Sequence, residues 1–381
     1  MNVLTVNVGA VTLKLSVVDD HDEEIASTHA DPWEAGDQGP LHDLRARLDT
    51  DEVTVDAVAH RIVHGGPYEQ AEVVDDRVEA TLRALAPLAP MHQDRTLDAI
   101  ATVRTMFASV PHIACFDTTF HRTMPPVVTT YPLPAEWRDR WDLRRHGFHG
   151  LSHAHVARAA PTIARVDPGA RIISCHLGSG VSVCAIRDGR SVDTTMGATP
   201  LEGPAMATRS GSVDPGLLTW LIEHGGLEPA NVSNALRRRS GLAALSGTSG
   251  DMRDVLEQKR LGDDRATLAL GVYVHRLRSA IGAMAAALDG LDVLAFTGGV
   301  GQNLSELRRA VTDRLTHLGI RVDPLLDKEA REDADISAPA AASSTVVVAT
   351  AEHLTMAREA RARVNGTQSA ASILRPPSRV E

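Results

Sequence analysis

A strand, a glycine turn and a second strand occur in the same arrangement twice, far apart in the chain. The first copy covers residues 3–18 and the second covers 172–186, so that Asn7 corresponds to His176. The first copy is rich in valine and leucine and the second in valine and isoleucine on either side of a glycine turn, a pattern that predicts paired β-strands. Such a repeat indicates internal duplication, and 381 residues are enough for two domains.

Helical patterns lie between and after these strand pairs. The clearest is 268–288, where apolar residues recur every three or four positions, which predicts a core helix. Strands followed by helices in each half indicate an α/β architecture with mixed sheets. The end of the chain, residues 364–381, is rich in Ser, Ala, Pro and Arg, and we expect it to be disordered.

The composition excludes several classes of protein. A net charge of −10 argues against nucleic-acid binding, which needs a clustered basic face. Three cysteines without metal-type spacing favour a reducing compartment. The chain starts without a basic region before an apolar stretch, and its most apolar segment, 280–296, is too short to cross a bilayer. We therefore expect a cytoplasmic protein.

Three glycine-rich segments stand where phosphate groups could bind: 7–12, 176–180 and 298–303. Glycine lets backbone N–H groups approach an anion without obstruction by Cβ. The third segment follows an apolar strand, and we expect a helix after it from about Ser305. Ordinary hairpin turns are the alternative, and the chain has no P-loop motif. Lys14, just past the first segment, could contact a phosphate or be a solvated strand lysine.

Charged residues beside small ones form a second group of candidates. Arg61 and Arg209 could bind carboxylate or phosphate oxygens, although a structural ion pair is equally compatible with either. Asp117 ends an apolar strand, where it could orient Mg²⁺ or cap a turn. The histidines of 144–155 lack a second ligand cluster for zinc, so we interpret His149 as a hydrogen-bond donor to a phosphoryl oxygen.

Five motifs, taken in order, resemble those of the acetate kinase family. They are HRIVHGG at His60, FDTTFHRTMP at Phe116, RRHGFHGLSH at Arg144, CHLGSG at Cys175 and SVDTTMGATPLEGPAMATRSG at Ser191. The resemblance extends from Val3 to about Arg358. The acetate kinase family is part of a larger group of proteins that share the duplicated fold of actin and the sugar kinases.

This resemblance implies a fold and a domain arrangement. The fold would consist of two duplicated ribonuclease H-like (actin-like ATPase) domains with mixed five-stranded sheets and an interdomain cleft. One domain would comprise residues 1–121 with 354–381, and the other, which would bind the nucleotide, residues 122–353. The family is usually dimeric, so the resemblance also implies a homodimer.

The resemblance further implies a reaction and roles for single residues. ATP would phosphorylate the carboxylate of acetate or propionate reversibly, with Mg²⁺ (or Mn²⁺) as cofactor. The catalytic residues would be Asp117, His149 and Arg209. Arg61 would bind the acid, and Asn7 and Glu352 would bind the metal. The nucleotide would contact Lys14, His176, Leu177, Gly178, Ser179, Gly180, Asp251, Met252, Arg253, Gly299, Val300, Gly301, Gln302 and Asn303.

The residue types suit that chemistry. A carboxylate is already ionised at neutral pH, so catalysis reduces to aligning two anions and cancelling their repulsion, which two arginines, a histidine and Mg²⁺ can do. Asp117 would then orient Mg²⁺ or an arginine and would not remove a proton.

The chain also departs from the family pattern. Ala10, Val11 and Thr12 replace three serines, and the motif Leu-His-Asn-Pro is missing at 88–92. Ser179 replaces the usual Asn and Gln302 the usual Glu. Two alternatives remain open: a nucleotide-binding relative that has lost turnover, and a sugar or polyol kinase, which would need a base to activate a hydroxyl group.

Overall fold

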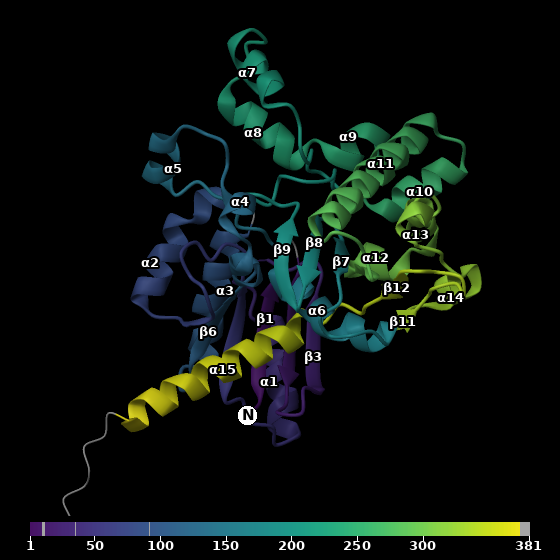
Figure 1. The fold of residues 1–381 in the computed structure, drawn as a ribbon. Helices are drawn as coiled ribbons and strands as arrows, with labels where there is room; N and C mark the ends of the chain where they lie inside the picture. The colour runs from purple at the N-terminus through teal and green to yellow at the C-terminus, as the bar shows by residue number, and fades with distance from the viewer. Residues whose placement is uncertain (10–11, 35, 91, 374–381) are drawn as a thin grey trace, which may run out of the picture. The chain divides into compact units, whose positions relative to one another are not determined.

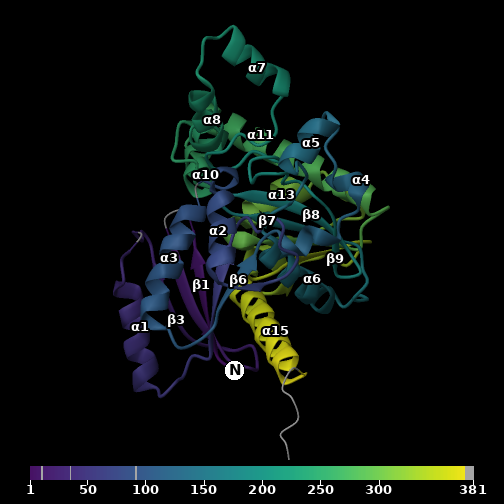
Figure 2. The same ribbon diagram turned by 90° about the vertical axis from the view of Figure 1, so that its left-hand side faces the viewer.

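The computed structural model describes residues 1–9, 12–34, 36–90 and 92–373, with side chains up to residue 366. The chain divides into two compact units (Figures 1 and 2). Unit 1 comprises Met1–Thr119 and Ala351–Glu381, and unit 2 comprises Phe120–Thr350. In the part of the chain that is described, no helix has the length and apolar character needed to cross a membrane.

Unit 1 is built on a six-stranded sheet with the order β3-β2-β1-β4-β6-β5. Its strands are β1 (Val3–Val8), β2 (Leu13–Val18), β3 (Glu24–Ala30), β4 (Ala57–Ile62), β5 (Glu72–Val73) and β6 (His112–Phe116). Its helices are α1 (Gly39–Thr50), α2 (Asp76–Ala84), the 3₁₀ turn η1 (Ala86–Leu88), α3 (Gln93–Met106) and α15 (Glu352–Ile373).

Helices cover both faces of the unit 1 sheet. Figure 2 shows α1 and α15 on opposite sides of it. Leu4, Val6 and Val8 of β1 pack in a core with α1 and α3, and α15 packs on β1, β4 and β6. Because successive side chains of a strand point to opposite faces, Asn7 lies on the face that α15 covers.

Unit 2 is built on a second six-stranded sheet, in the order β11-β12-β10-β7-β8-β9. Its strands are β7 (Ile172–Leu177), β8 (Val181–Arg187), β9 (Arg190–Thr194), β10 (Val293–Thr297), β11 (Ala334–Asp335) and β12 (Ser344–Val347). Its helices are α4 (Pro126–Thr129), α5 (Ala135–Trp141), α6 (Gly150–Ala164), α7 (Pro215–Glu223), α8 (Pro229–Arg238), α9 (Gly241–Ser246), α10 (Met252–Arg260), α11 (Asp264–Ala287), α12 (Gly298–Asn303), α13 (Ser305–Thr312), η3 (Thr316–Leu318) and α14 (Pro324–Glu329). The 3₁₀ turn η2 (Thr119–Thr123) joins the two units.

The two sheets share one topology, which confirms the predicted duplication. In unit 1, β1 pairs antiparallel with β2 and parallel with β4, and β4 pairs parallel with β6. In unit 2, β7 has the same relation to β8 and β10, and β10 to β12. The predicted α/β fold is therefore confirmed.

The expected five-stranded sheets each have a sixth strand. β5 and β11 each pair antiparallel with an outer parallel strand at the sheet edge. Each is only two residues long, too short to show the alternation by which a strand is recognised in a sequence.

Two helices bear on other expectations. α11 is a core helix, as predicted for 268–288, with Leu270, Leu277 and Ile281 among its buried residues. α15 continues to Ile373 and so includes the first part of the segment 364–381 for which we expected disorder. Residues 374–381 lie outside the described part of the chain.

Candidate functional site

In unit 1, three of the predicted site residues lie at the carboxyl ends of neighbouring parallel strands. Asn7 is near the end of β1, Arg61 is near the end of β4, and Asp117 directly follows β6. The carboxyl ends of parallel strands are a frequent location for ligand sites in α/β sheets. Glu352, the first residue of α15, comes to the same edge because α15 covers this face.

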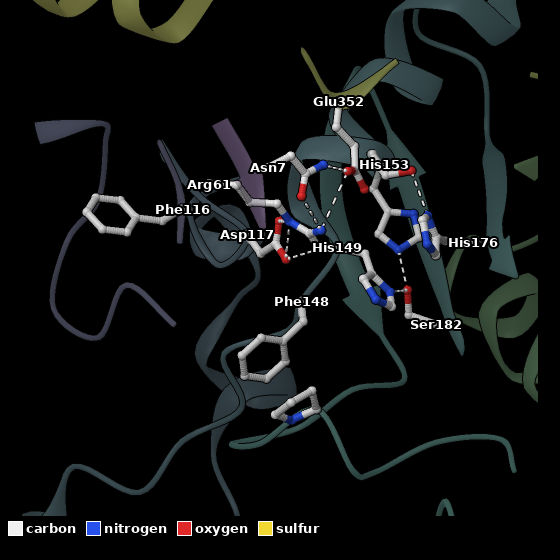
Figure 3. Close-up of polar contacts among 12 residues, drawn as sticks. Asn7, Arg61, Phe116, Asp117, Phe148, His149, His153, His176, Ser182 and Glu352 are labelled. Atoms are coloured by element: carbon white, nitrogen blue, oxygen red, sulfur yellow. Dashed lines mark hydrogen bonds and ion pairs between the residues drawn. The ribbon is translucent and has the colours of Figure 1, made fainter. Parts of the chain in front are cut away.

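These four residues form one hydrogen-bonded group, which we call the Arg61 cluster (Figure 3). Arg61 makes a bidentate contact with Asp117: Nη2 donates to Oδ2 at 2.7 Å, and Nε donates to Oδ1 at 3.1 Å. Arg61 Nη1 donates to Asn7 Oδ1 at 3.1 Å and lies 3.6 Å from Glu352 Oε2. Asn7 Nδ2 donates to the same Glu352 oxygen at 2.6 Å. The structure thus brings together four residues that are far apart in the sequence.

Low solvent exposure strengthens the electrostatic interactions among the charged groups of this cluster. The side chain of Asp117 is 1% exposed and that of Arg61 14%. Burial acts to lower the pKa of Arg61, but the charges of Asp117 and Glu352 outweigh it and hold that pKa above its ordinary value. The guanidinium therefore stays charged.

Oxygen ligands for a metal are present in the Arg61 cluster. In the described part of the chain, no three or more His, Cys, Asp or Glu side chains gather into a ready-made metal site. Mg²⁺ usually takes one or two protein carboxylates and completes its shell with water and substrate phosphates. The carboxylate of Glu352 and the amide oxygen of Asn7 fit such an open site in their chemistry.

The first glycine-rich segment is described only in part. Ala10 and Val11 lie outside the described residues, and the Gly9 amide donates to the Thr12 carbonyl at 2.8 Å. Lys14 pairs with Asn7 across β1 and β2, and its side chain is exposed.

In unit 2, His149 occupies an unusual backbone position just before α6. Its φ of 56° and ψ of 26° are left-handed, a conformation that costs free energy in residues other than glycine. Its Nδ1 lies 2.9 Å from Ser182 Oγ, and its ring stacks on that of His176 at a centroid distance of 4.1 Å. His176 Nδ1 lies in turn 2.8 Å from Ser152 Oγ of α6.

Arg209 comes close to the same glycine turn. A Cβ built on Gly180 would lie 3.3 Å from His149 Nε2 and 3.4 Å from Arg209 Nη1. Arg209 Nη1 donates to the Pro200 carbonyl at 2.9 Å, and burial lowers the pKa of Arg209 to about 10. The structure thus groups His149, His176 and Arg209 around the turn at Gly180, and we call these four residues the His149 group.

The backbone that carries Arg209 is packed against the other predicted nucleotide segments. The Ala207 amide donates to the Ser179 carbonyl at 3.2 Å. Gly250, with φ of 87°, lies so close to Ala207 that a Cβ would come within 2.4 Å of its carbonyl oxygen. Asp251 then caps α10 by accepting from the Arg253 amide, and its carboxylate pairs with the Arg253 guanidinium at 2.6 Å. Met252, between them, is buried.

The third glycine-rich segment differs from the expected loop. Gly299–Asn303 belongs to the short helix α12, and the expected helix near Ser305 is a second one, α13. Gly298 makes this possible: its φ is 79°, and a Cβ there would lie 2.6 Å from the Leu177 carbonyl oxygen. Glycine content suggested a loop because glycine is a poor helix former, but α12 is held by contacts with β7 and β10.

A buried ion pair fixes the end of α12. Arg308 and Asp327 are both fully buried, with Nε 2.6 Å from Oδ1. Arg308 Nη1 also donates to the carbonyls of Gly301 and Gln302 at 2.8 and 2.7 Å. The Gln302 side chain binds the Arg331 carbonyl at 2.7 Å. This segment, which includes Val300, is therefore rigidly placed at the carboxyl end of β10.

The sequence comparison decides the family. Residues 15–358 match the model of the Acetokinase family. The chain belongs to this family. Its members among the curated proteins include an acetate kinase of Gloeothece citriformis, 43% identical over 307 residues, which are 80% of this chain and 76% of that protein. An acetate kinase of Synechococcus sp. is 46% identical over 300 residues, 78% of this chain and 74% of that protein.

Solved structures agree with the family assignment. The acetate kinase of Porphyromonas gingivalis superposes with a TM-score of 0.84 at 32% identity, covering 95% of this chain and 99% of that one. A propionate kinase from Francisella tularensis gives a TM-score of 0.85 at 29% identity, with the same coverage. The acetokinase fold is thus shown for nearly the whole chain.

Several residues that support the site escaped the sequence reasoning. Ser182 and Ser152 bond to the predicted His149 and His176, His153 bonds to Ser182, and Arg308 bonds to the end of α12. His153 lies in the histidine-rich motif, so the sequence did mark it as a candidate. A buried serine in a strand resembles any other strand residue, so nothing in the sequence marked Ser182 as a candidate.

Proposed function

We propose that this acetokinase-family protein transfers the γ-phosphoryl group of ATP reversibly to the carboxylate of a short-chain acid, acetate or propionate. The relatives named acetate kinase and the structural neighbour named propionate kinase support this substrate class. The observation that carries the proposal is the Arg61 cluster, in which a partly buried, permanently charged guanidinium is held at the strand ends. Such a group suits an anionic substrate.

Unit 1 supplies the residues for the acid and the metal. Arg61 binds the carboxylate of the acid, and Asp117 fixes the guanidinium by its two-armed contact. Glu352 and Asn7 would hold Mg²⁺, which would neutralise charge on the phosphates when bound. Because the acid is already ionised, Asp117 need not remove a proton and acts by orientation and charge.

Unit 2 supplies the residues for the phosphates and the nucleotide. His149 and Arg209 both direct nitrogen atoms toward the space beside Gly180, where they would stabilise negative charge on the transferred group. The nucleotide contacts of unit 2 are along 176–180, 251–253 and 299–303. The packing of these unit 2 segments on one another and on the parallel strand ends supports that assignment.

A hydroxamate assay for acyl phosphate tests the reaction. ATP and Mg²⁺ with acetate, propionate or butyrate should give the coloured hydroxamate, with acetate or propionate preferred, whereas glycerol and glucose should not stimulate ADP release. A protein that binds ATP but forms no acyl phosphate from any acid would refute the proposed reaction. ADP release with a polyol would favour a sugar or polyol kinase.

A pair of matched variants tests Arg61. Arg61→Lys keeps the positive charge but loses the planar guanidinium that makes the bidentate contact with Asp117 and that we propose binds the acid. The KM for the acid should therefore rise about tenfold or more. Arg171→Lys is the control, because Arg171 makes the same two-armed contact with Asp292 at 2.6 and 3.0 Å on the surface. Equal KM values in both variants would contradict the role of Arg61.

We also infer that the protein is a cytoplasmic homodimer. Helix α7 buries none of its side chains, and Leu217, Trp220 and Ile222 are exposed by 49, 54 and 37%. Exposed apolar patches of this kind mark contact surfaces, and a second copy is the partner the family resemblance implies. Light scattering should give twice the 40.7 kDa of one chain, and Trp220→Glu should give the monomer. A monomeric wild-type protein would refute the inference.

A further inference from the structure

A chain of four side chains leads from the interior of unit 2 to His149. His149 Nδ1 lies 2.9 Å from Ser182 Oγ, and the same oxygen lies 2.7 Å from His153 Nε2. His153 Nδ1 lies 2.8 Å from Ser174 Oγ. Figure 3 shows His149 and His153 meeting at Ser182. Ser174, His153 and Ser182 are buried, and we call the series the serine–histidine relay.

The number of protons in the relay restricts its hydrogen-bond direction. Complete burial, with a smaller effect of His121 and His176, holds the pKa of His153 well below its ordinary value, so His153 is neutral. A neutral imidazole donates from one nitrogen and accepts at the other, and a hydroxyl has a single proton. Ser182 can therefore donate to only one of the two histidines, although its oxygen can accept from both. Either all the bonds run toward His149, or His149 Nδ1 donates to Ser182, whose proton then goes to His153 or, if His153 also donates, outside the relay.

The two directions give His149 different properties. When the bonds run toward it, Ser174 donates to His153, His153 donates to Ser182, and Ser182 donates to Nδ1 of His149. A neutral His149 then carries its proton on Nε2. In the reverse direction Nδ1 donates to Ser182, and Nε2 presents a lone pair.

The surroundings of Nε2 favour the first direction. This nitrogen and Arg209 Nη1 lie beside the same position at Gly180, where the proposed function places a phosphoryl oxygen. Arginine has only donors, and an anion held by it would be repelled by a lone pair on Nε2. An N–H at Nε2 would add a second donor without requiring a charged imidazole.

We propose, on the basis of the proposed function, that Ser182 and His153 are positioning residues that hold neutral His149 in the Nε2–H form. The relay thereby makes His149 a hydrogen-bond donor at pH values where free histidine is mostly uncharged. His176, stacked on His149, keeps the ring plane in place. Neither Ser182 nor His153 touches the reacting atoms.

The direct test is the protonation pattern of the ring. Two-dimensional ¹H–¹⁵N spectra of the full chain with ¹⁵N-labelled histidine at pH 8 distinguish Nε2–H from Nδ1–H, and His149→Gln identifies the signal. We expect Nε2–H in the wild type and a mixture of both forms in Ser182→Ala. An Nδ1–H signal in the wild type, or an unchanged pattern in Ser182→Ala, would overturn the proposal.

Kinetics give the second measurement. Ser182→Ala should lower kcat about tenfold or more, because a histidine in the wrong form loses its catalytic hydrogen bond, while the KM for ATP stays within about twofold. Ser182→Thr, which keeps the hydroxyl, should restore both kcat and the Nε2–H signal. A lowered kcat that Ser182→Thr does not restore would indicate a packing role only and would count against the proposal.

Control variants separate the relay from general disturbance. Ser191→Ala removes a different buried serine hydroxyl, 2.8 Å from His121 Nδ1, and should leave the His149 signal unchanged. His153→Gln should break the relay at the next link if Ser182→Ala does not fold. The spectra need no substrate, so failure of this proposal and absence of acyl-phosphate formation are separate results.

Discussion

Asp117 receives hydrogen bonds from both Nε and Nη2 of Arg61 and is almost entirely buried. In Asp117→Asn the side chain keeps its size but no longer offers a negative charge to the guanidinium. We expect kcat to fall about 100-fold or more, the scale of losing one preorganised electrostatic group, with the circular dichroism spectrum unchanged. Asp292→Asn, which uncouples the surface Arg171, should be nearly silent. Turnover near that of the wild type in Asp117→Asn would contradict the assigned role.

His121 is a buried histidine that should make the fold sensitive to acid. Burial lowers its pKa from 6.5 to about 4, and its ring bonds to Ser191 Oγ and to the Phe148 carbonyl. Between these pH values the unfolded chain binds a proton that the folded chain does not, so stability is full above pH 6.5 and falls as the pH drops toward 4. The loss is about 3 kcal/mol for this group alone.

Urea titrations at pH 7.5, 5.5 and 4.5 measure this loss. His60 and His153 have lowered pKa values for the same reason, burial, and add to the effect in the same direction. His121→Gln should make the midpoint less dependent on pH than in the wild type. A midpoint that rises as the pH falls would show the sign to be wrong.

At the level of single residues, the site residues that could be predicted from the sequence are those at strand ends and in motifs. Asp117 was found because it ends an apolar strand and Arg61 because it stands beside small residues, whereas Asn7 was placed in a glycine-rich segment and its role at the metal came from the family resemblance. Ser182 could not be found, because its importance depends on His149 and His153, which approach it only in the folded unit. Gln302 was expected at the nucleotide, and its side chain bonds to the Arg331 carbonyl and the Thr350 amide.

Among the elements, the most informative is α12, which shows how one glycine shapes a segment. Gly298→Ala would place a methyl group 2.6 Å from the Leu177 carbonyl oxygen at a φ of 79°. We expect a loss of about 1–3 kcal/mol in the free energy of unfolding, measured by urea denaturation. Gly299→Ala is the matched control, because no atom lies within 4 Å of its added Cβ, and alanine favours a helix. Equal losses in the two variants would contradict this account of α12.

The repeated elements carry a repeated contact. In unit 1, Asn7 of β1 bonds to Glu352 at the start of α15, and in unit 2 the corresponding His176 of β7 bonds to Ser152 near the start of α6. The strand pairs of both units were predictable from their apolar runs. The residues alone did not predict the helices that complete them, although the family resemblance assigned 354–381 to the first domain. The helix α6 precedes its sheet in the chain, whereas α15 follows its own by more than the whole of unit 2.

At the scale of the whole molecule, unit 1 depends on both ends of the chain. Met356, Ala357 and Ala360 of α15 are fully buried, and Arg358 and Arg361 both pair with Asp22. A chain that ends at Thr350 should therefore unfold in unit 1, since one face of its sheet would be exposed to water. Limited proteolysis with mass spectrometry should find new cleavage sites in 1–119 and few in unit 2.

A shorter truncation provides the control for that experiment. A chain that ends at Gly366 retains all these α15 contacts and should resist protease as the wild type does. Protection of 1–119 in the chain that ends at Thr350 would mean that the sheet of unit 1 is stable without α15.

The position of α15 also has a consequence for synthesis. A ribosome makes the strands of the unit 1 sheet before unit 2, but the helix that covers this sheet, α15, leaves the exit tunnel only after unit 2. The covering helix of unit 2, α6, is made before the first strand of its sheet. Unit 2 can therefore finish folding while unit 1 still lacks α15. Folding during translation therefore runs opposite to the usual order, in which amino-terminal domains fold first. Until α15 emerges, a chaperone that shields apolar strands would find its substrate in the strands of unit 1.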